Sequence, residues 1–484
     1  MSISGALSNA LTGLTASSRA AGVVSTNLAN ILTEGYAPRS IELTAQGEGQ
    51  GGGVTVSGVN RQVDVALLNE RRLADSAVSH AAELASFATT LETEIGTPDD
   101  VQSLTARIAN LEASLLSAAT RPEEETRLTD VALKAGQLAD KLNSVSDHLQ
   151  TERTRADGQI EQTVADVNLK LEQIQSLNAQ IANARNVGHP NASLQDQRQT
   201  AIDALAGLIP VRLTERDNGT VAVYTPGGAI LVDGKAAVLT FQASNVIAPH
   251  MTLENGLLSG LEINGVPVIT SGERSPIEGG RLAALFEVRD TLSTDAQAQV
   301  DALARNLIER FQDPSLDTTL AVGDPGVFTD RGLAFDAINE VGVAGRISLN
   351  SLIDPANGGD AYKLRDGLGT AVPGPVGNSV LLTGMQAALN ILDSVVSGSL
   401  GATERSLSGH AATLTSRFSQ QRLSLEEIVT FSTARQSGLV ETELENGVDS
   451  DAELQRLLLI EQAYSANARM VQTVEEMLDT LMRI

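Results

Sequence analysis

Apolar residues recur along the first 31 residues in alternating steps of four and three. Eight of the nine positions in this series are apolar. This spacing is typical of a coiled-coil seam rather than of the broader apolar stripe of a helix on a globular core. Arg19 is the only charged residue before Glu34, so we expect the isolated helix to be marginal in water and to need a partner. The members of this first seam are Ile3, Leu7, Ala10, Leu14, Ser17, Ala21, Val24, Leu28 and Ile31.

The last segment of the chain carries the same period. Its one polar member is Asn467, and a single buried Asn in such a seam can fix register and partner number at a cost in stability. We therefore expect the two ends to form an antiparallel helix pair. The alternative is that each end is an ordinary amphipathic helix packed on its own domain. The members of this second seam are Leu457, Ile460, Tyr464, Asn467, Val471, Val474, Leu478 and Leu481.

Helical spacing also dominates the segment between the two ends. One seam runs from Val63 to Ile95, and Thr97-Pro98 followed by two acids predicts the start of the next helix. A second start signal ends at Glu125, and the helical pattern after it could run nearly unbroken to Gly188. A helix of that length without internal caps indicates a rod.

The period changes near residue 207. Alternating segments flank the hairpin signal at 217–219 (Asp-Asn-Gly), and strand-like pieces continue to about residue 274. Residues 313–377 are rich in Gly and read as loops, and residues 47–53 read as a flexible Gly-rich connection. The predicted fold is mainly α with β inserts: terminal coiled-coil helices, a long-helix bundle body and a central β-rich domain.

The predicted segments follow from these changes of period. They are an N-terminal assembly helix and linker (1–60), a long-helix body (61–205), a β-rich insert domain (206–274), a helical body (275–312), a loop-rich or β insert (313–377), a further helical body (378–430) and a C-terminal assembly helix (431–484).

Composition excludes several classes of function. The 484 residues contain 34 Lys plus Arg and 60 Asp plus Glu, a formal charge of −26, which disfavours nucleic acid and anionic membrane surfaces as partners. Cysteine is absent, so disulfides and thiolate metal sites are excluded. Residues 1–10 lack the basic and apolar regions of a cleavable secretory signal, and no apolar stretch approaches the ~18–20 residues of a membrane span.

No catalytic or metal-binding constellation is evident. The five histidines are scattered, and the Asp-rich turn at 354–360 lacks the ligand alternation of a calcium loop. We therefore predict neither an enzyme nor a bound cofactor or metal. Two alternatives stay open from the residues: an enzyme carried by the β insert, such as a peptidoglycan hydrolase or a protease, and a free-standing coiled-coil chaperone.

Two terminal motifs carry a family resemblance. Residues 27–36 read Asn-Leu-Ala-Asn-Ile-Leu-Thr-Glu-Gly-Tyr and resemble the Asn-x-x-Thr-x-Gly-Tyr signature of flagellar rod, hook and hook-associated proteins. Residues 461–481 are similar to the C-terminal signature of the same class. Within this class the length, the helical body and the central β insert most resemble the hook-associated proteins. The alternatives within the class are the hook protein and the third hook-associated protein.

The resemblance implies a structural axial protein of the bacterial flagellum, located at the junction between hook and filament. It implies export of the unfolded chain from the cytoplasm by the flagellar type III apparatus, and polymerisation through the terminal helices outside the cell. The implied partners are the hook protein, neighbouring copies, the next hook-associated protein and a cytoplasmic export chaperone on the C-terminal helix, with no nucleic acid and no membrane.

The residues expected to carry subunit assembly are the seam and motif residues of the two termini. They are Leu7, Leu14, Val24, Leu28, Asn30, Thr33, Gly35, Tyr36, Leu457, Ile460, Tyr464, Asn467, Arg469, Val471, Val474, Leu478 and Leu481.

Overall fold

The computed structural model describes residues 3–33, 35–46, 52–272, 274–395, 397–401 and 403–483. Long helices dominate it, and its strands lie in small sheets, which confirms the predicted mainly α fold with β inserts. The α-helices are α1 (Ile3–Ala29), α2 (Val65–Ile95), α3 (Leu104–Thr120), α4 (Glu125–Asn186), α5 (Ala192–Leu208), α6 (Gly280–Glu287), α7 (Ser293–Gln312), α8 (Lys363–Asp366), α9 (Val380–Asn390), α10 (Leu407–Glu445) and α11 (Ser450–Met482).

The strands are short and pair antiparallel within four sheets of the described residues. They are β1 (Arg39–Ala45), β2 (Val54–Arg61), β3 (Arg212–Glu215), β4 (Val221–Tyr224), β5 (Ile230–Asp233), β6 (Lys235–Ala236), β7 (Leu239–Thr240), β8 (Leu261–Ile263), β9 (Val266–Val268), β10 (Phe328–Asp330) and β11 (Ile347–Leu349).

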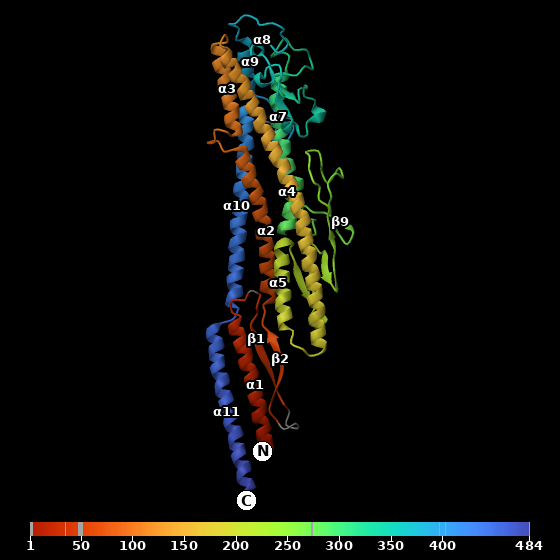
Figure 1. Ribbon diagram of the computed structural model, residues 1–484, viewed down its shortest axis with the longest axis vertical. Helices are drawn as coiled ribbons and strands as arrows, with labels where there is room; N and C mark the ends of the chain where they lie inside the picture. The colour runs from red at the N-terminus through yellow and green to blue at the C-terminus, as the bar shows by residue number, and fades with distance from the viewer. Residues whose placement is uncertain are drawn as a thin grey trace. The chain divides into compact units, whose positions relative to one another are not determined.

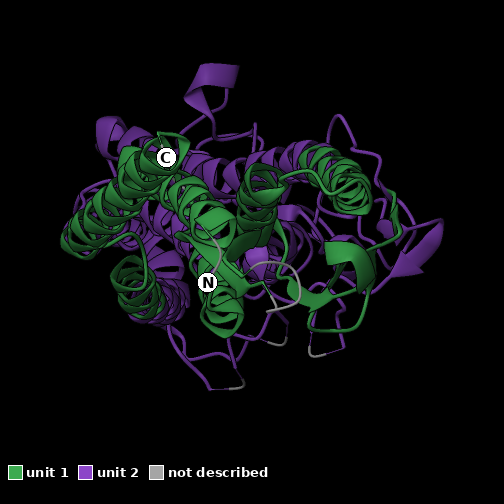
Figure 2. Cartoon of the chain, turned by 90° about the horizontal axis from the view of Figure 1, so that it is seen from below, with its two compact units in different colours: residues 1–78, 166–238, 432–484 green, residues 79–165, 239–431 purple. Residues whose placement is uncertain are grey.

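The chain divides into two compact units (Figure 2). Unit 1 comprises residues 1–78, 166–238 and 432–484, and unit 2 comprises residues 79–165 and 239–431. Helices α2, α4 and α10 each contribute residues to both units. The strands of the predicted β-rich segment fall in two sheets, β3-β4-β5-β6 in unit 1 and β7-β8-β9 in unit 2.

Unit 1 contains both terminal helices. Figure 1 shows α11 beside α1 with the two chain ends at the same end of the pair, so the helices run in opposite directions. The hairpin β1–β2 packs beside α1, with Arg39 opposite Arg61 and Ala45 opposite Val54. The terminal helices predicted from the heptad spacing are therefore present, and they pack against each other.

The hairpin was not foreseen from the sequence. The Gly-rich residues 47–53 predict only a flexible connection, and residues 47–51 lie outside the described residues. The chain on either side forms β1 and β2, whose ladder has an irregularity between Glu42 and Leu43. Gly53 takes a positive φ of 109°, a conformation that glycine adopts without strain.

The start of α3 corrects a second prediction. The Thr97-Pro98 signal was expected to open a helix, but residues 97–102 form turns and α3 begins at Leu104. The Asp100 carboxylate accepts a hydrogen bond from the Gln102 N–H at 2.8 Å, which closes a turn. The Ser103 hydroxyl oxygen then caps the helix by accepting from the Ala106 N–H at 3.2 Å.

The long helix after Glu125 and the hairpin at 217–219 are confirmed. Helix α4 has 62 residues and continues to Asn186. Strands β3 and β4 pair across a short 3₁₀ turn at Asp217–Gly219, in which Asn218 has a φ of 57°. Asn178 of α4 is buried and binds β4 through both ends of its amide, accepting from the Val221 N–H and donating to the Val221 carbonyl.

In unit 2, a buried carboxylate fastens part of the loop-rich segment to α7. Asp301 accepts from the backbone N–H groups of Gly342 and Ala344 at 2.7 and 2.8 Å and from the Gln297 amide at 2.9 Å. Burial outweighs these donors and raises the pKa of Asp301 from 3.8 to about 6. Between these two values the folded chain binds the proton more tightly than the unfolded chain. The stability contributed by this group is therefore fully present below about pH 3.8 and is lost as pH rises through about 6.

Replacing Asp301 with Asn tests this linkage. We expect the free energy of unfolding of the wild-type chain, relative to Asp301→Asn, to rise by about 1 kcal/mol between about pH 7 and pH 5. Denaturant unfolding at the two pH values measures it. The exposed Asp295→Asn in the same helix is the control, and an equal change in both variants would contradict the assignment.

Candidate assembly surface on the paired terminal helices

The face of α1 that is buried within unit 1 consists mainly of small side chains. The buried residues of this helix are Ala10, Ala16, Ala20, Val24 and Asn27. Small residues let neighbouring backbones approach closely, but they remove little apolar area from water. Such a face allows a neighbouring backbone to lie close to α1, but the contact buries little apolar area.

Gly13 of α1 and Asn467 of α11 lie in close contact. A Cβ atom placed on Gly13 would lie 2.7 Å from Nδ2 and 2.9 Å from Oδ1 of Asn467. Asn467 donates its own amide to the Ala463 carbonyl at 3.0 Å. The Asn side chain thus fills the space that the glycine leaves, and this contact fixes how far along α1 the last helix lies.

Asn27 organises the end of α1. Its side chain is fully buried, and its Oδ1 accepts from the Tyr36 hydroxyl at 2.7 Å and from the Arg39 N–H at 3.0 Å. Its Nδ2 donates to the Arg39 carbonyl at 2.9 Å. One amide therefore joins the helix, the tyrosine after it and the first residue of β1.

The residues between Asn27 and Tyr36 turn the chain. The Asn30 amide donates to the Thr26 carbonyl at 2.8 Å, and the Thr33 hydroxyl donates to Asn30 Oδ1 at 3.1 Å. Gly35 takes a φ of 75°, the left-handed conformation common after helix ends. The terminal motif is thus a helix stop with its own hydrogen bonds.

Charged groups surround Tyr36. The Arg39 guanidinium lies over its ring at 4.8 Å from the centroid. Burial raises the pKa of the Tyr36 hydroxyl, the nearby Asp196 and Glu453 carboxylates raise it further, and Arg39 opposes them. Glu453 is only 7% exposed, and one of its carboxylate oxygens has no hydrogen-bond partner among the described residues.

Two ionic clusters hold the neighbouring elements of unit 1. Asp196 of α5 pairs with Arg39 and Arg61, the two ends of the hairpin, each at 2.7 Å. Arg71 of α2 contacts Asp203 of α5 at 2.8 Å and Glu443 near the end of α10 at 2.6 Å. The first cluster fastens the hairpin to α5, and the second fastens the chain shortly before α11 begins.

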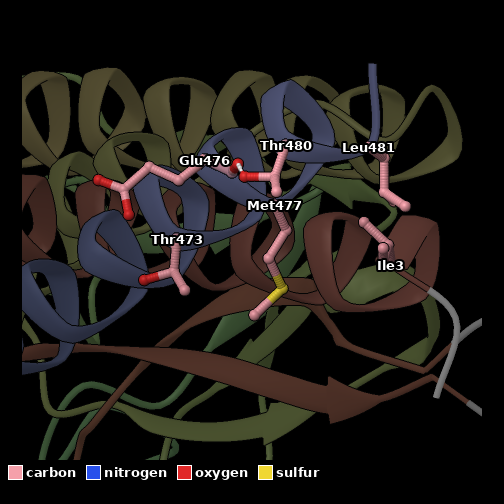
Figure 3. Close-up of a pocket in the computed structure, with 6 residues that line it drawn as sticks. All are labelled: Ile3, Thr473, Glu476, Met477, Thr480 and Leu481. Atoms are coloured by element: carbon pink, nitrogen blue, oxygen red, sulfur yellow. Dashed lines mark hydrogen bonds between the residues drawn. The ribbon is translucent and has the colours of Figure 1, made fainter. Parts of the chain in front are cut away.

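The pair of helices leaves much apolar surface on α11 exposed to water. Leu459 is 67% exposed and Leu458 59%, and Glu453 and Val474 are its only buried described residues. Near the chain ends there is an open hollow on the surface (Figure 3). It is lined by residues of α11, among them Met477 and Leu481, and by Ile3 of α1. An exposed apolar row of this kind along a helix marks a contact surface.

The expected assembly residues differ in how far unit 1 covers them. Val24 and Val474 are buried, whereas Leu28 and Leu457 are each 36% exposed. The partly covered members are Leu7, Leu14, Asn30, Gly35, Tyr36, Ile460, Asn467 and Val471. The other exposed members are Thr33, Tyr464, Arg469, Leu478 and Leu481.

The sequence analysis did not select Gly13, Asn27, Arg61, Asp196 or Glu453 as site residues. Asn27 carries a signal, because it is a polar residue three positions after the seam residue Val24 and precedes the helix stop. Glu453 also carries one, since it continues the second seam four residues before Leu457. Gly13, Arg61 and Asp196 carry none, because their partners lie far away in sequence.

Among the described residues, no group of three or more His, Asp and Glu side chains is arranged to hold a metal ion. No helix in the described part of the chain is long and apolar enough to cross a membrane.

Comparisons with known proteins match both the body and the end of the chain. Residues 88–322 match the family model for the helical domain of the flagellar hook-associated protein FlgK. Residues 445–484 match the model for the C-terminal region of the flagellar basal body rod proteins FlgEFG.

Individual relatives extend the match. Flagellar hook-associated protein 1 of Bacillus subtilis is 23% identical over 515 residues, covering 98% of this chain and 96% of the relative. The Escherichia coli protein of the same name is 26% identical, covering 62% of this chain and 56% of the relative. The solved structure of the flagellar hook junction protein FlgK from Burkholderia pseudomallei is 22% identical with a TM-score of 0.44, covering 54% of this chain and 46% of that one.

Replacing Asn27 tests the helix stop. In Asn27→Leu the Tyr36 hydroxyl and the Arg39 N–H and carbonyl, which are part-buried, lose their partner, and we expect the helix stop to be destabilised by about 1 kcal/mol or more. We expect the Arg39 amide to lose hydrogen-exchange protection. Tyr36→Phe removes a single bond and should keep most of it, and equal protection in all three proteins would refute the role of Asn27.

Filling Gly13 tests the close approach of the helices. Gly13→Ala places a methyl group against Asn467 and should destabilise the pair by about 1–3 kcal/mol. Hydrogen exchange along α11 reports the loss, and Asn467→Ala in the same chain should restore part of it. The matched control is Gly22→Ala, where an added Cβ meets no atom within 4 Å. Equal effects of the two alanines would contradict this contact.

Proposed function

We propose that this chain, which is related over its whole length to flagellar hook-associated protein 1, is the structural subunit that joins the flagellar hook to the filament. More generally, the matches to flagellar hook-associated and rod proteins support a role as a structural component of the flagellar axis. The relatives found are structural proteins, and we assign no catalytic role to the chain. Its working location is the outer part of the flagellum, after synthesis in the cytoplasm.

The observation that carries the proposal is the incomplete burial of α11. The side chains of Leu457, Tyr464 and Leu478 belong to one heptad seam, yet they stay 36–48% exposed beside α1. Removing apolar surface from water contributes about 25 cal/mol per Å². Contact with further helices would therefore stabilise this segment, and neighbouring copies supply such helices at high local concentration.

The incomplete burial of the terminal helices is also compatible with export of the unfolded chain. A chain that crosses a narrow channel unfolded cannot depend on disulfides, and this sequence has no cysteine. Its terminal helices gain order when copies assemble, because binding to the folded state adds to stability by mass action. The residues proposed to form the contacts are the seam and motif residues named in the sequence analysis.

The partners follow from the position in the flagellar axis. They are neighbouring copies of this chain, the hook protein on one side and the next hook-associated protein on the other. Before export, a cytoplasmic chaperone covers the exposed apolar row of α11. The second candidate function is another axial subunit, which the match of residues 445–484 to rod proteins favours.

Truncation tests the proposed assembly role. A chain ending at Asp449 lacks α11, so we expect it to be absent from the hook tip while unit 2, to which α11 does not belong, keeps its fold. Immunoelectron microscopy measures incorporation, and circular dichroism measures the remaining helices. Truncated chains at the hook tip at the wild-type level would overturn the proposal.

Deleting the gene separates the two candidate functions. Cells with hooks but no filaments would support a junction subunit, because only the step after the hook is lost. Rods without hooks would instead support a hook subunit. Electron microscopy of isolated flagellar structures distinguishes these outcomes, and expression of the full chain from a plasmid is the control.

A further inference from the structure

Arg19 is the only charged side chain in α1, and it is exposed. Among the described residues it has no ion pair and no hydrogen bond. The rest of the helix surface is small or uncharged, so this guanidinium is the dominant electrostatic feature of α1. A single charge on a helix of 27 residues is therefore well placed to define a contact.

Glu461 is its counterpart on α11. The carboxylate is exposed, and it too has no ion pair or hydrogen bond within the described part of the chain. Helix α11 has six acidic and two basic residues, a net charge of −4. The two terminal helices thus carry opposite net charges, +1 and −4.

The contact between Gly13 and Asn467 relates these two charges in space. Arg19 follows Gly13 by six residues, and Glu461 precedes Asn467 by six residues. Because the helices are antiparallel (Figure 1), both charges lie at one level, about 9 Å along the pair from that contact.

The helical rotation places the charges on opposite faces of the pair. Six residues turn an α-helix by about 600°, which leaves each side chain about 120° from the direction of the partner helix. Since the helices are antiparallel, the two rotations point to opposite sides. Arg19 and Glu461 of one copy therefore cannot meet, whereas those of two adjacent copies at the same level can.

We infer that Arg19 of one copy pairs with Glu461 of the next, so that the outer face of α11 packs on the outer face of α1 in the neighbouring copy. The inference rests on the proposed assembly function and specifies its contact. Because two different faces meet, the contact is heterologous and repeats around a ring or a helical array.

The surroundings of the two charges fit this pairing. Leu458 and Leu454 precede Glu461 by three and seven residues, so they share its face, and they are 59% and 46% exposed. At the level of Leu458 the facing α1 has Gly22, where an added Cβ would meet nothing within 4 Å. The neighbouring copy thus offers open space to an apolar side chain that water now surrounds.

Charge excludes the other ways of placing terminal helices side by side. Contact between two copies of α11 would bring together helices with a net charge of −4 each, and like charges repel. Contact between two copies of α1 would bury little apolar surface, since Leu11 and Leu28 are its only exposed large hydrophobic side chains within Ile3–Ala29. Only the contact between α11 and α1 combines opposite charge with apolar burial.

Thiol cross-linking tests the pairing directly, because the chain has no cysteine of its own. Cells would carry the full chain with Arg19→Cys and Glu461→Cys, and their isolated flagella would be treated with a short bismaleimide. We expect dimers and higher multimers on denaturing gels. Arg19→Cys with Glu475→Cys is the control, since Glu475 lies fourteen residues further along α11, about 21 Å away.

Charge reversal tests whether the pair determines assembly. Arg19→Glu and Glu461→Arg, each alone, should lower the amount of this chain in isolated flagella by about tenfold, since each places like charges together. The double reversal should restore it to within about twofold of the wild type. Glu475→Arg makes the same charge change on α11 and should have little effect.

The two experiments separate this inference from the assembly function. If the truncation at Asp449 prevents incorporation but the cysteine pair gives no multimers beyond its control, the pairing is wrong and the proposed function stands. Tolerated single reversals would likewise overturn the pairing. Incorporation of the truncated chain would overturn the proposed function itself.

Discussion

The close approach of α1 and α11 is the constraint on which the terminal part of unit 1 depends. Gly13 of α1 leaves space that the Asn467 side chain of α11 fills, and the buried side chains of α1 are mostly alanine. The same small residues cover little of the last helix. The small side chains of α1 therefore explain both the close contact and the exposed leucines of α11. Further helices are needed to cover those leucines.

The second organising feature is the set of polar contacts around the end of α1. Asn27 fixes the tyrosine and the first strand residue, and Asp196 holds both ends of the hairpin. Asp196 lies far from the other groups in sequence, and all of them are partly or fully buried. Charge-assisted hydrogen bonds are short and directional, so they set the geometry at a place where apolar packing is thin.

Periodicity alone predicts the long elements of this fold. The spacing of apolar residues gives α1, α4 and α11 because their seams continue over many turns, and the change of period near residue 207 gives the strands that follow. The sequence did not predict which face of α1 is buried. The heptad seam predicts that Leu28 faces inward, yet Leu28 is 36% exposed, whereas Ala16 and Ala20 are buried. A close contact requires small side chains, even where larger ones are more hydrophobic. The hairpin escaped prediction because the glycine-rich sequence between its strands dominated the pattern.

The Asn27 amide has a consequence for the register of the hairpin. It holds both the N–H and the carbonyl of Arg39, so the end of α1 fixes the position of the first residue of β1. A strand displaced by one residue would present every side chain to the wrong face. The end of α1 therefore anchors β1 at Arg39, and β2 is aligned through the same residue, because Arg61 lies opposite it in the ladder.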